Sequence, residues 1–146
     1  MNYLKPRFVN KKRRFGISIP ERLAKSLDAL TQALGADRSS LIREALREYL
    51  HDHSHYLKPH ECGGVMILLE NRDHMYLLHI LEEYDDIVCN YNHVHVGRYC
   101  IDIVVVSGSS SRIAHLHNRL LSELKCRIRY IPIGKCSLEL AEDMQP

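Results

Sequence analysis

Apolar and polar residues alternate over a short N-terminal segment and then recur at helical spacing in two longer segments. Between residues 14 and 19 every second residue is apolar, which is the pattern of a strand that turns one face to a core. Pro20 then fits the first turn of a helix, leucines follow at helical intervals, and Gly35 supplies a stop. A second apolar series of helical period starts near Asp37 or Ser39. The pattern predicts a strand followed by two helices.

A second group of elements follows a segment without periodicity. Residues 52–63 include a proline and the first of two glycines, which is typical of a linker. Beyond them the order strand, helix, strand, strand, helix, strand is expected at 65–69, 72–84, 87–95, 100–106, 110–124 and 127–133. This βαββαβ order predicts a ferredoxin-like domain, so the fold class is α+β. The predicted organisation is a basic arm (1–13), a βαα head (14–51), the linker (52–63), the ferredoxin-like domain (64–134) and a tail (135–146).

The N-terminal strand needs a partner, because a lone strand of this length leaves both edges unpaired. Pairing with the same strand of a second chain gives a two-stranded antiparallel ribbon over the helices of both chains, the ribbon-helix-helix arrangement. Such a ribbon fits the major groove of DNA. The apolar side chains would face the helices, while the bases would be read by Arg14, Gly16 and Ser18. Phosphates would be bound at the start of the second helix, by Arg38, Ser39 and Arg43. The alternative is an ordinary edge strand whose Arg and Ser face solvent.

Charge is distributed unevenly along the chain. The net charge is only +2, yet residues 1–14 carry six basic side chains and no acidic one. A basic arm on a mildly acidic body indicates contact with a polyanion, most often nucleic acid. Beside the predicted strand, Lys11, Lys12 and Arg13 would add contacts to DNA. The alternative is a solvated tail.

The overall composition narrows the class of protein. No apolar run approaches the roughly 20 residues that a helix needs to span a bilayer, and no apolar stretch follows the basic N-terminus as it would in a secretory signal. Without a signal, the five cysteines are interpreted as reduced thiols rather than a disulfide framework. We therefore expect a cytoplasmic protein with no membrane partner.

A candidate metal site lies on a predicted hairpin. His93 and His95 are two residues apart on a strand, so their imidazoles project from one face. Gly97 can occupy the first position of a two-residue type II′ turn, and that register places Cys100 opposite His95. Two imidazoles and a thiolate suit nickel, zinc, copper or cobalt and exclude magnesium and calcium. The alternative is that the three residues simply pack on one face of a sheet. A fourth ligand would have to come from elsewhere.

These segments together resemble the nickel-responsive transcriptional regulators of the NikR family. The stretch 14–23 is similar to the family's DNA-reading strand and first helix, and 38–44 resembles its RSEAIRD segment. His93-Val-His95 followed by Cys100-Ile-Asp-Ile-Val-Val-Val-Ser-Gly resembles its HVH…CLEVIVVxG signature. The resemblance implies an ACT-like second domain and a homotetramer of two ribbon-helix-helix dimers around four C-terminal domains. It also implies one nickel ion per subunit, held by His93, His95, Cys100 and a His of the neighbouring chain. The implied role is repression of nickel uptake through a palindromic operator in double-stranded DNA, bound when metal is loaded.

Two positions depart from the family pattern. Where the resemblance implies the neighbour's His, this chain has Glu82, and the segment between His95 and Cys100 is one residue shorter. A carboxylate favours square-planar nickel less than an imidazole does and suits tetrahedral or higher-coordinate ions better. His79, one turn earlier on the same helix face, is an alternative donor. The metal could accordingly be cobalt, zinc or copper.

The other histidines support weaker hypotheses. A second metal store or a solvated linker would account for His51, His53, His55, His60 and Cys62. His115 and His117 are two apart on a predicted helix, so they point in different directions and cannot share one ion.

Three other functions compete with a metal-responsive repressor. The chain could store metal, with an incidental basic arm, or it could be a ribbon-helix-helix repressor that does not respond to metal because of Glu82. An enzyme with a His₂Cys metal site is disfavoured, because the sequence offers no placed general base and no cofactor motif. We therefore expect a protein that is not an enzyme and has no small-molecule organic substrate.

Overall fold

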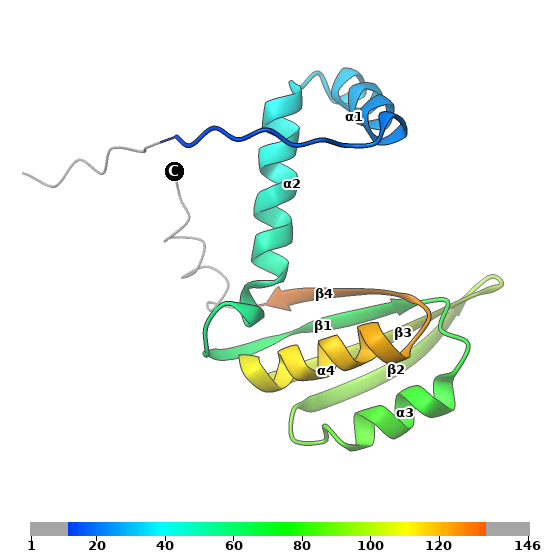
Figure 1. The fold of residues 1–146 in the computed structure, drawn as a ribbon. Coiled ribbons are helices and arrows are strands. Elements are labelled where there is room, and N and C mark those ends of the chain that lie inside the picture. Colours follow the sequence, from blue (N-terminus) through cyan, green and yellow to red (C-terminus); the bar gives the residue numbers. More distant parts are fainter. Residues whose placement is uncertain (1–11, 134–146) are drawn as a thin grey trace, which may run out of the picture. The chain divides into compact units, whose positions relative to one another are not determined.

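Two helices follow the N-terminal segment where the sequence pattern predicts them. In the computed structural model, which describes residues 12–133, α1 spans Glu21–Leu34 and α2 spans Arg38–Asp52 (Figure 1). Gly35 ends α1 in the left-handed conformation, with a φ of 62° that glycine adopts without strain. Asp37 caps α2, since its Oδ1 accepts a hydrogen bond of 3.0 Å from the backbone N–H of Ser40. The predicted end of the first helix and the predicted start of the second are both confirmed.

Residues 12–20 lie outside any helix or strand of the single chain. Phe15 and Ile17, the apolar side chains of the predicted strand, are 73% and 59% exposed. An exposed apolar row of this kind is typical of a surface that another chain covers. Its pairing with the same segment of a second chain stays a prediction, because the structure contains one chain.

The second unit begins at residue 45 and is built on an antiparallel sheet with the strand order β2-β3-β1-β4. Its elements follow the predicted βαββαβ order (Figure 1), with β1 at Glu61–Leu69, α3 at His74–Glu82, β2 at Val88–Val96, β3 at Tyr99–Ser109, α4 at Ser110–Glu123 and β4 at Arg127–Ile133. The α+β class is confirmed. None of the helices within residues 12–133 is long and apolar enough to cross a membrane.

The segment predicted to be a linker contains more regular structure than its composition indicated. A short 3₁₀ turn, η1, spans Ser54–Tyr56, and β1 already begins at Glu61. The glycine pair lies inside β1 because a neighbouring strand approaches closely there. A Cβ on Gly64 would lie 2.5 Å from the ring of Tyr130 and 2.6 Å from the backbone oxygen of Ile131.

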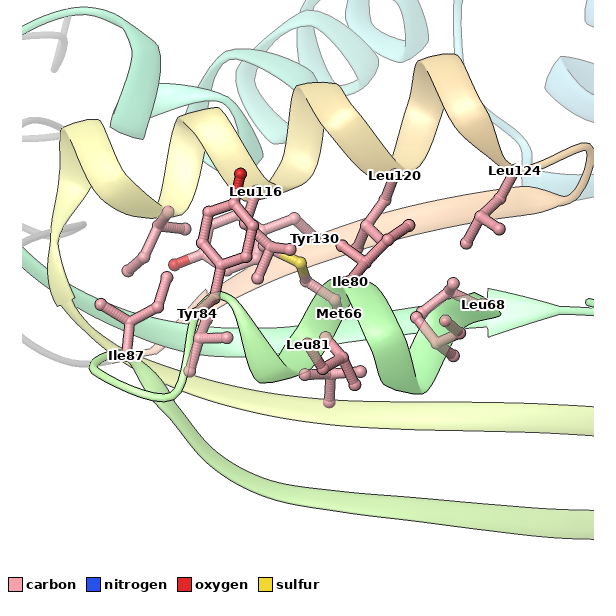
Figure 2. Close-up of a cluster of buried hydrophobic side chains, with 14 of the residues drawn as sticks. Met66, Leu68, Ile80, Leu81, Tyr84, Ile87, Leu116, Leu120, Leu124 and Tyr130 are labelled. Carbon is pink, nitrogen blue, oxygen red and sulfur yellow. The ribbon is translucent and has the colours of Figure 1, made fainter. Parts of the chain in front are cut away.

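The core of the second unit lies between one face of the sheet and the helices α3 and α4 (Figure 2). Alternate residues of β1 and β3 point into it, and each fully buried aliphatic side chain contributes about 1.5–3 kcal/mol. Among the fully buried side chains are Met66, Leu68, Leu77, Ile80, Val104, Ile113, Leu116 and Leu120.

The opposite face of the sheet carries a second apolar row that stays partly exposed in the single chain. Neighbouring strands contribute to it through pairs such as Val94 with Ile101 and Val96 with Tyr99. The most exposed members are Val94, Val96, Tyr99, Ile131 and Ile133.

Candidate metal centre and nucleic-acid interface

The hairpin between β2 and β3 has the predicted register. His95 lies opposite Cys100, and Val96 lies opposite Tyr99. Gly97 has a φ of 60°, and the φ of Arg98 is negative. A positive φ at the first turn position followed by a negative φ at the second is typical of a type II′ turn. His93, His95 and Cys100 therefore share one face of the hairpin, as predicted.

The imidazole of His95 lies between the side chains of His93 and Cys100 and contacts each through a different nitrogen. The Nε2 atoms of His93 and His95 lie 3.1 Å apart, and the Sγ of Cys100 lies 3.7 Å from Nδ1 of His95. Two nitrogens that bind one ion at about 2.0–2.1 Å are separated by roughly 2.9–3.4 Å when they are adjacent in a square or a tetrahedron. The spacing of the two imidazoles fits adjacent ligands of a single ion.

A buried carboxylate orients this site. Asp102 lies opposite His93 in the sheet and is fully buried. Its Oδ1 accepts hydrogen bonds of 2.7 Å from Nδ1 of His93 and from the hydroxyl of Tyr91. Burial and the adjacent carboxyl raise the pKa of Tyr91, so the phenol keeps its proton and donates it. With its proton on Nδ1, His93 directs the lone pair of Nε2 toward His95.

His74, the first residue of α3, stands beside the hairpin site. Its ring centroid lies 4.1 Å from that of His93, in an edge-to-face arrangement. One donor atom each from His74, His93 and Cys100 lie within 4.8 Å of one another. Sequence reasoning gave neither His74 nor Asp102 a role. Asp102 carried a signal, because it is two residues beyond Cys100 on the same strand face, whereas His74 reaches the site only through the packing of α3.

The two residues proposed as a fourth ligand from a neighbouring chain do not join these donors within one chain. Glu82 is exposed at the end of α3. The Nε2 of His79 lies 3.9 Å from a carboxylate oxygen of Glu83, and its side chain is largely solvated. A contribution of either residue to a second chain remains a prediction.

The donor set fits a borderline transition ion, because it combines imidazoles with one thiol. A bound ion would act as a Lewis acid that links the two strands of the hairpin. The residues that would hold it are His93, His95 and Cys100, with His74 adjacent.

The residues predicted to contact DNA lie in the N-terminal unit. Arg14, Gly16 and Ser18 are exposed at alternate positions, and Lys12 and Arg13 are exposed beside them, while Lys11 lies outside the described residues. In a strand formed with a second chain, these alternate positions would share one side, as predicted.

All three residues predicted to bind phosphate at the start of α2, Arg38, Ser39 and Arg43, are exposed. The guanidinium of Arg43 donates to the backbone oxygen of Ser39 at 3.2 Å and to the hydroxyl of Ser40 at 3.1 Å. Arg38 instead donates to the carboxylate of Asp28 in α1, which lowers the pKa of that carboxyl. Both groups of this ion pair are exposed, so it contributes little to stability and phosphate could compete for Arg38.

A second histidine cluster occupies part of the segment predicted to be a solvated linker. His55 and His117 are buried, with Nε2 of the former 3.2 Å from Nδ1 of the latter, and the hydroxyl of Tyr56 lies 2.9 Å from that same Nδ1. Burial lowers the pKa of both imidazoles to about 4. The solvated interpretation is therefore wrong for His55. His115 points elsewhere, toward the hydroxyl of Tyr84 at 2.6 Å, which confirms that His115 and His117 do not share a site.

Comparison with known proteins gives matches to both units. The model described as "Ribbon-helix-helix protein, copG family" matches residues 13–52, and the "NikR C terminal nickel binding domain" matches residues 70–126. Relatives from Pyrococcus furiosus and Thermococcus kodakarensis are each 31% identical over 115 residues, which is 75% of this chain and 83% of theirs. A relative from Methanococcus maripaludis is 31% identical over 117 residues, with the same coverage. The names of all three describe nickel-responsive regulators.

Proposed function

This chain belongs to the nickel-responsive regulator family, and from that premise we propose that it is a nickel-dependent repressor that binds a palindromic operator as a homotetramer. Its family identifies it as a metal-responsive transcription regulator with a ribbon-helix-helix DNA-binding domain, and not as an enzyme. The observation that carries the proposal is the placement of His93, His95 and Cys100 side by side on one hairpin face, where the buried carboxylate of Asp102 orients His93. We propose one nickel ion per subunit at this place, and the cytoplasm as the compartment where such a regulator meets DNA.

Sequence-specific recognition is proposed for the N-terminal segment. Paired with its copy in a second chain, the segment would present Arg14, Gly16 and Ser18 to the bases of the major groove. Arginine can make a bidentate contact to guanine, and serine can bond several bases. Lys12 and Arg13, with Lys11 before them, would add phosphate contacts that make binding salt-dependent.

Self-association is supported by apolar surface in both units. Phe15 and Ile17 stay largely exposed in the N-terminal unit of a single chain, and the face of the sheet away from α3 and α4 carries exposed apolar side chains in the other. A two-fold ribbon would cover the first surface, and contact between sheets would cover the second. Two independent self-complementary surfaces on one chain produce a dimer of dimers.

Repression requires that metal binding and operator binding favour the same state of the protein. By linkage, an ion that raises operator affinity is itself bound more tightly in the presence of operator. We propose that nickel acts in this direction. Another borderline ion is the second candidate, because Glu82 stands where the family resemblance implies an imidazole and a carboxylate suits tetrahedral ions better.

The proposal is tested by titrating operator binding with metals. Operator sequences are selected from a random DNA pool with nickel-loaded protein, and affinity is then measured at fixed salt with nickel, cobalt, zinc or copper. Nickel should raise operator affinity in the wild type and in Cys89→Ala, whose thiol is exposed on β2 away from the donors. Cys100→Ala should lose that response.

The remaining results of this titration separate the competing functions. If zinc or cobalt raises operator affinity and nickel does not, the protein is a regulator that responds to a metal other than nickel. Operator binding that no metal changes would refute metal control. Metal binding without sequence-selective DNA binding would leave only a storage role.

A further inference from the structure

His74 offers the metal site a fourth donor, which the hairpin alone lacks. We propose that His74 is the fourth metal ligand, so that a single chain supplies the complete donor set of His74, His93, His95 and Cys100. This inference rests on the proposed function only in that the hairpin site binds a transition ion. The ligands expected from a neighbouring chain, Glu82 or His79, would then not be needed.

The backbone fixes the position of His74 before any metal binds. Asp73 caps α3, since its Oδ1 accepts a hydrogen bond of 3.0 Å from the backbone N–H of Tyr76. Asn71 in turn accepts a hydrogen bond of 3.1 Å from the backbone N–H of Asp73. The loop that leads into α3 is therefore held by two side-chain contacts, and the first helical residue is held beside β2. A ligand whose backbone is already ordered loses less conformational entropy on binding.

The distances between donors fit a single ion. One donor atom from each of His74, His93 and Cys100 lie within 4.8 Å of one another. Metal–nitrogen distances of about 2.0–2.1 Å and a metal–sulfur distance of about 2.3 Å place opposite ligands of a square roughly 4.1–4.4 Å apart, and tetrahedral ligands closer. The 4.8 Å limit exceeds these values, so the side chains would have to rotate about their χ angles to bind one ion. His95 lies outside this group of three but already has its Nε2 3.1 Å from that of His93.

Burial shows that these side chains are partly shielded rather than freely solvated. The side chain of His74 is 33% exposed and that of His93 is 25% exposed. By contrast, His79, on the same helix, is 65% exposed and lies beside a glutamate. Of these two imidazoles of α3, only His74 faces the donors of the hairpin.

Two buried polar atoms in this site lack hydrogen bonds in the single chain. The Nδ1 of His74 and the Oδ2 of Asp102 lie 3.3 Å apart, yet neither has a hydrogen-bond partner among the described residues. Buried polar atoms of this kind are destabilising unless something pairs them. Coordination through Nε2 would keep the proton of His74 on Nδ1, where Oδ2 can accept it. One carboxylate would then orient two metal-binding imidazoles, His93 through Oδ1 and His74 through Oδ2.

The first experiment compares metal affinity in matched histidine variants. Nickel and zinc affinities are measured by competition with a chromophoric chelator for the wild type, His74→Ala, His79→Ala and Glu82→Ala. His74→Ala should weaken both metals at least tenfold, and the other two variants should stay within about twofold of the wild type. Unchanged affinity in His74→Ala, or a tenfold loss in Glu82→Ala or His79→Ala, would overturn the proposal. Thermal unfolding of each metal-free protein checks that the variants fold.

The second experiment asks whether the donors belong to one chain. Chains carrying His74→Ala and chains carrying Cys100→Ala are co-refolded, and mixed oligomers are isolated through two different tags. Cobalt(II) is added, and the thiolate-to-cobalt charge-transfer band is recorded as the readout. A site within one chain predicts a band no stronger than that of the His74→Ala oligomer alone, since every chain lacks one of the ligands. A restored band would show that His74 binds the ion of a neighbouring chain and would refute the proposal.

Failure of this inference differs from failure of the proposed function. If His74→Ala loses metal affinity while no metal changes operator binding by the wild type, the four-ligand site stands and metal control of DNA binding fails. If nickel strengthens operator binding equally in the wild type and in His74→Ala, metal control stands and the four-ligand site fails.

Discussion

Among single residues, Asp102 has the largest effect on the proposed metal site, because its buried carboxylate orients the imidazole ligands. It accepts hydrogen bonds from His93 and Tyr91 and lies 3.3 Å from His74, so it faces the groups that would bind metal without being exposed to solvent itself. A carboxylate in this position fixes the tautomer of an imidazole ligand and increases its basicity. The metal affinity of the site is therefore expected to depend on a residue that does not bind the ion.

Replacing this carboxylate should weaken metal binding without removing a ligand. Asp102→Asn keeps the shape of the side chain but loses the charge, and we expect nickel affinity to fall by about 10–100-fold. Chelator competition measures the loss, with Asp85→Asn on the exposed loop after α3 as the control. Equal affinities for the two variants would contradict the role given to Asp102.

The buried pair His55 and His117 should make stability depend on pH. Burial lowers the pKa of each from 6.5 to about 4 in the folded chain, so between these values the unfolded chain binds protons that the folded chain does not. The free energy of unfolding should therefore be fully maintained above about pH 6.5 and should decrease as the pH falls toward 4. Each proton involved contributes a slope of up to about 1.4 kcal/mol per pH unit.

Urea unfolding of metal-free protein across this pH range measures the effect. His55→Phe should flatten the decrease, because it removes one of the buried titrating groups. The control His79→Phe changes an exposed imidazole and should leave the slope as it is in the wild type. A slope that His55→Phe does not alter would refute this account of the pair.

At the scale of elements, the sequence predicts most of the fold and about half of the site. Helical spacing with Gly35 and Asp37 at its limits predicts α1 and α2, and the Gly97 turn predicts the register that joins His95 to Cys100. These features depend on local backbone preferences, which a sequence displays directly.

The remaining features depend on contacts between distant segments. His74 reaches the hairpin only because the start of α3 packs beside β2, and no local spacing relates it to His93. His55 and His117 come together across 62 positions of the chain. For the same reason the glycine pair predicts a linker from the sequence, since only the pairing of β1 with β4 shows that a close approach requires Gly64.

The two glycines of β1 offer a matched test of that close approach. A Cβ on Gly64 would overlap the ring of Tyr130 and a backbone oxygen, whereas the nearest atom to a Cβ on Gly63 is 3.4 Å away. Gly64→Ala should lower the free energy of unfolding by roughly 1–3 kcal/mol, as overpacking does, and Gly63→Ala should lower it much less. Thermal unfolding measures both, and equal losses would contradict the packing of β1 against β4.

At the scale of the whole molecule, apolar surface predicts how chains associate. The sheet face away from α3 and α4 exposes Ile133 by 56%, and the outer side of α4 exposes Leu121 by 49%. The proposed tetramer uses the sheet face, where a continuous apolar row can be covered by a second copy.

A charged side chain on that face should split the proposed tetramer into dimers. Ile133→Asp should reduce a four-chain particle to two chains that the N-terminal ribbon still joins, and sedimentation equilibrium measures the mass. Leu121→Asp adds the same charge at a comparably exposed apolar position and should leave the mass unchanged. Dissociation by Leu121→Asp alone would place the contact on the helices instead.

We propose that metal at the hairpin controls sequence-specific binding by the N-terminal ribbon. The most direct measurement is the ratio of operator affinity to random-DNA affinity for the wild-type protein, first with nickel and then after its removal by a chelator. We expect nickel to raise this ratio at least tenfold and the chelator to reverse the rise. A ratio that stays the same with and without metal would contradict the claim.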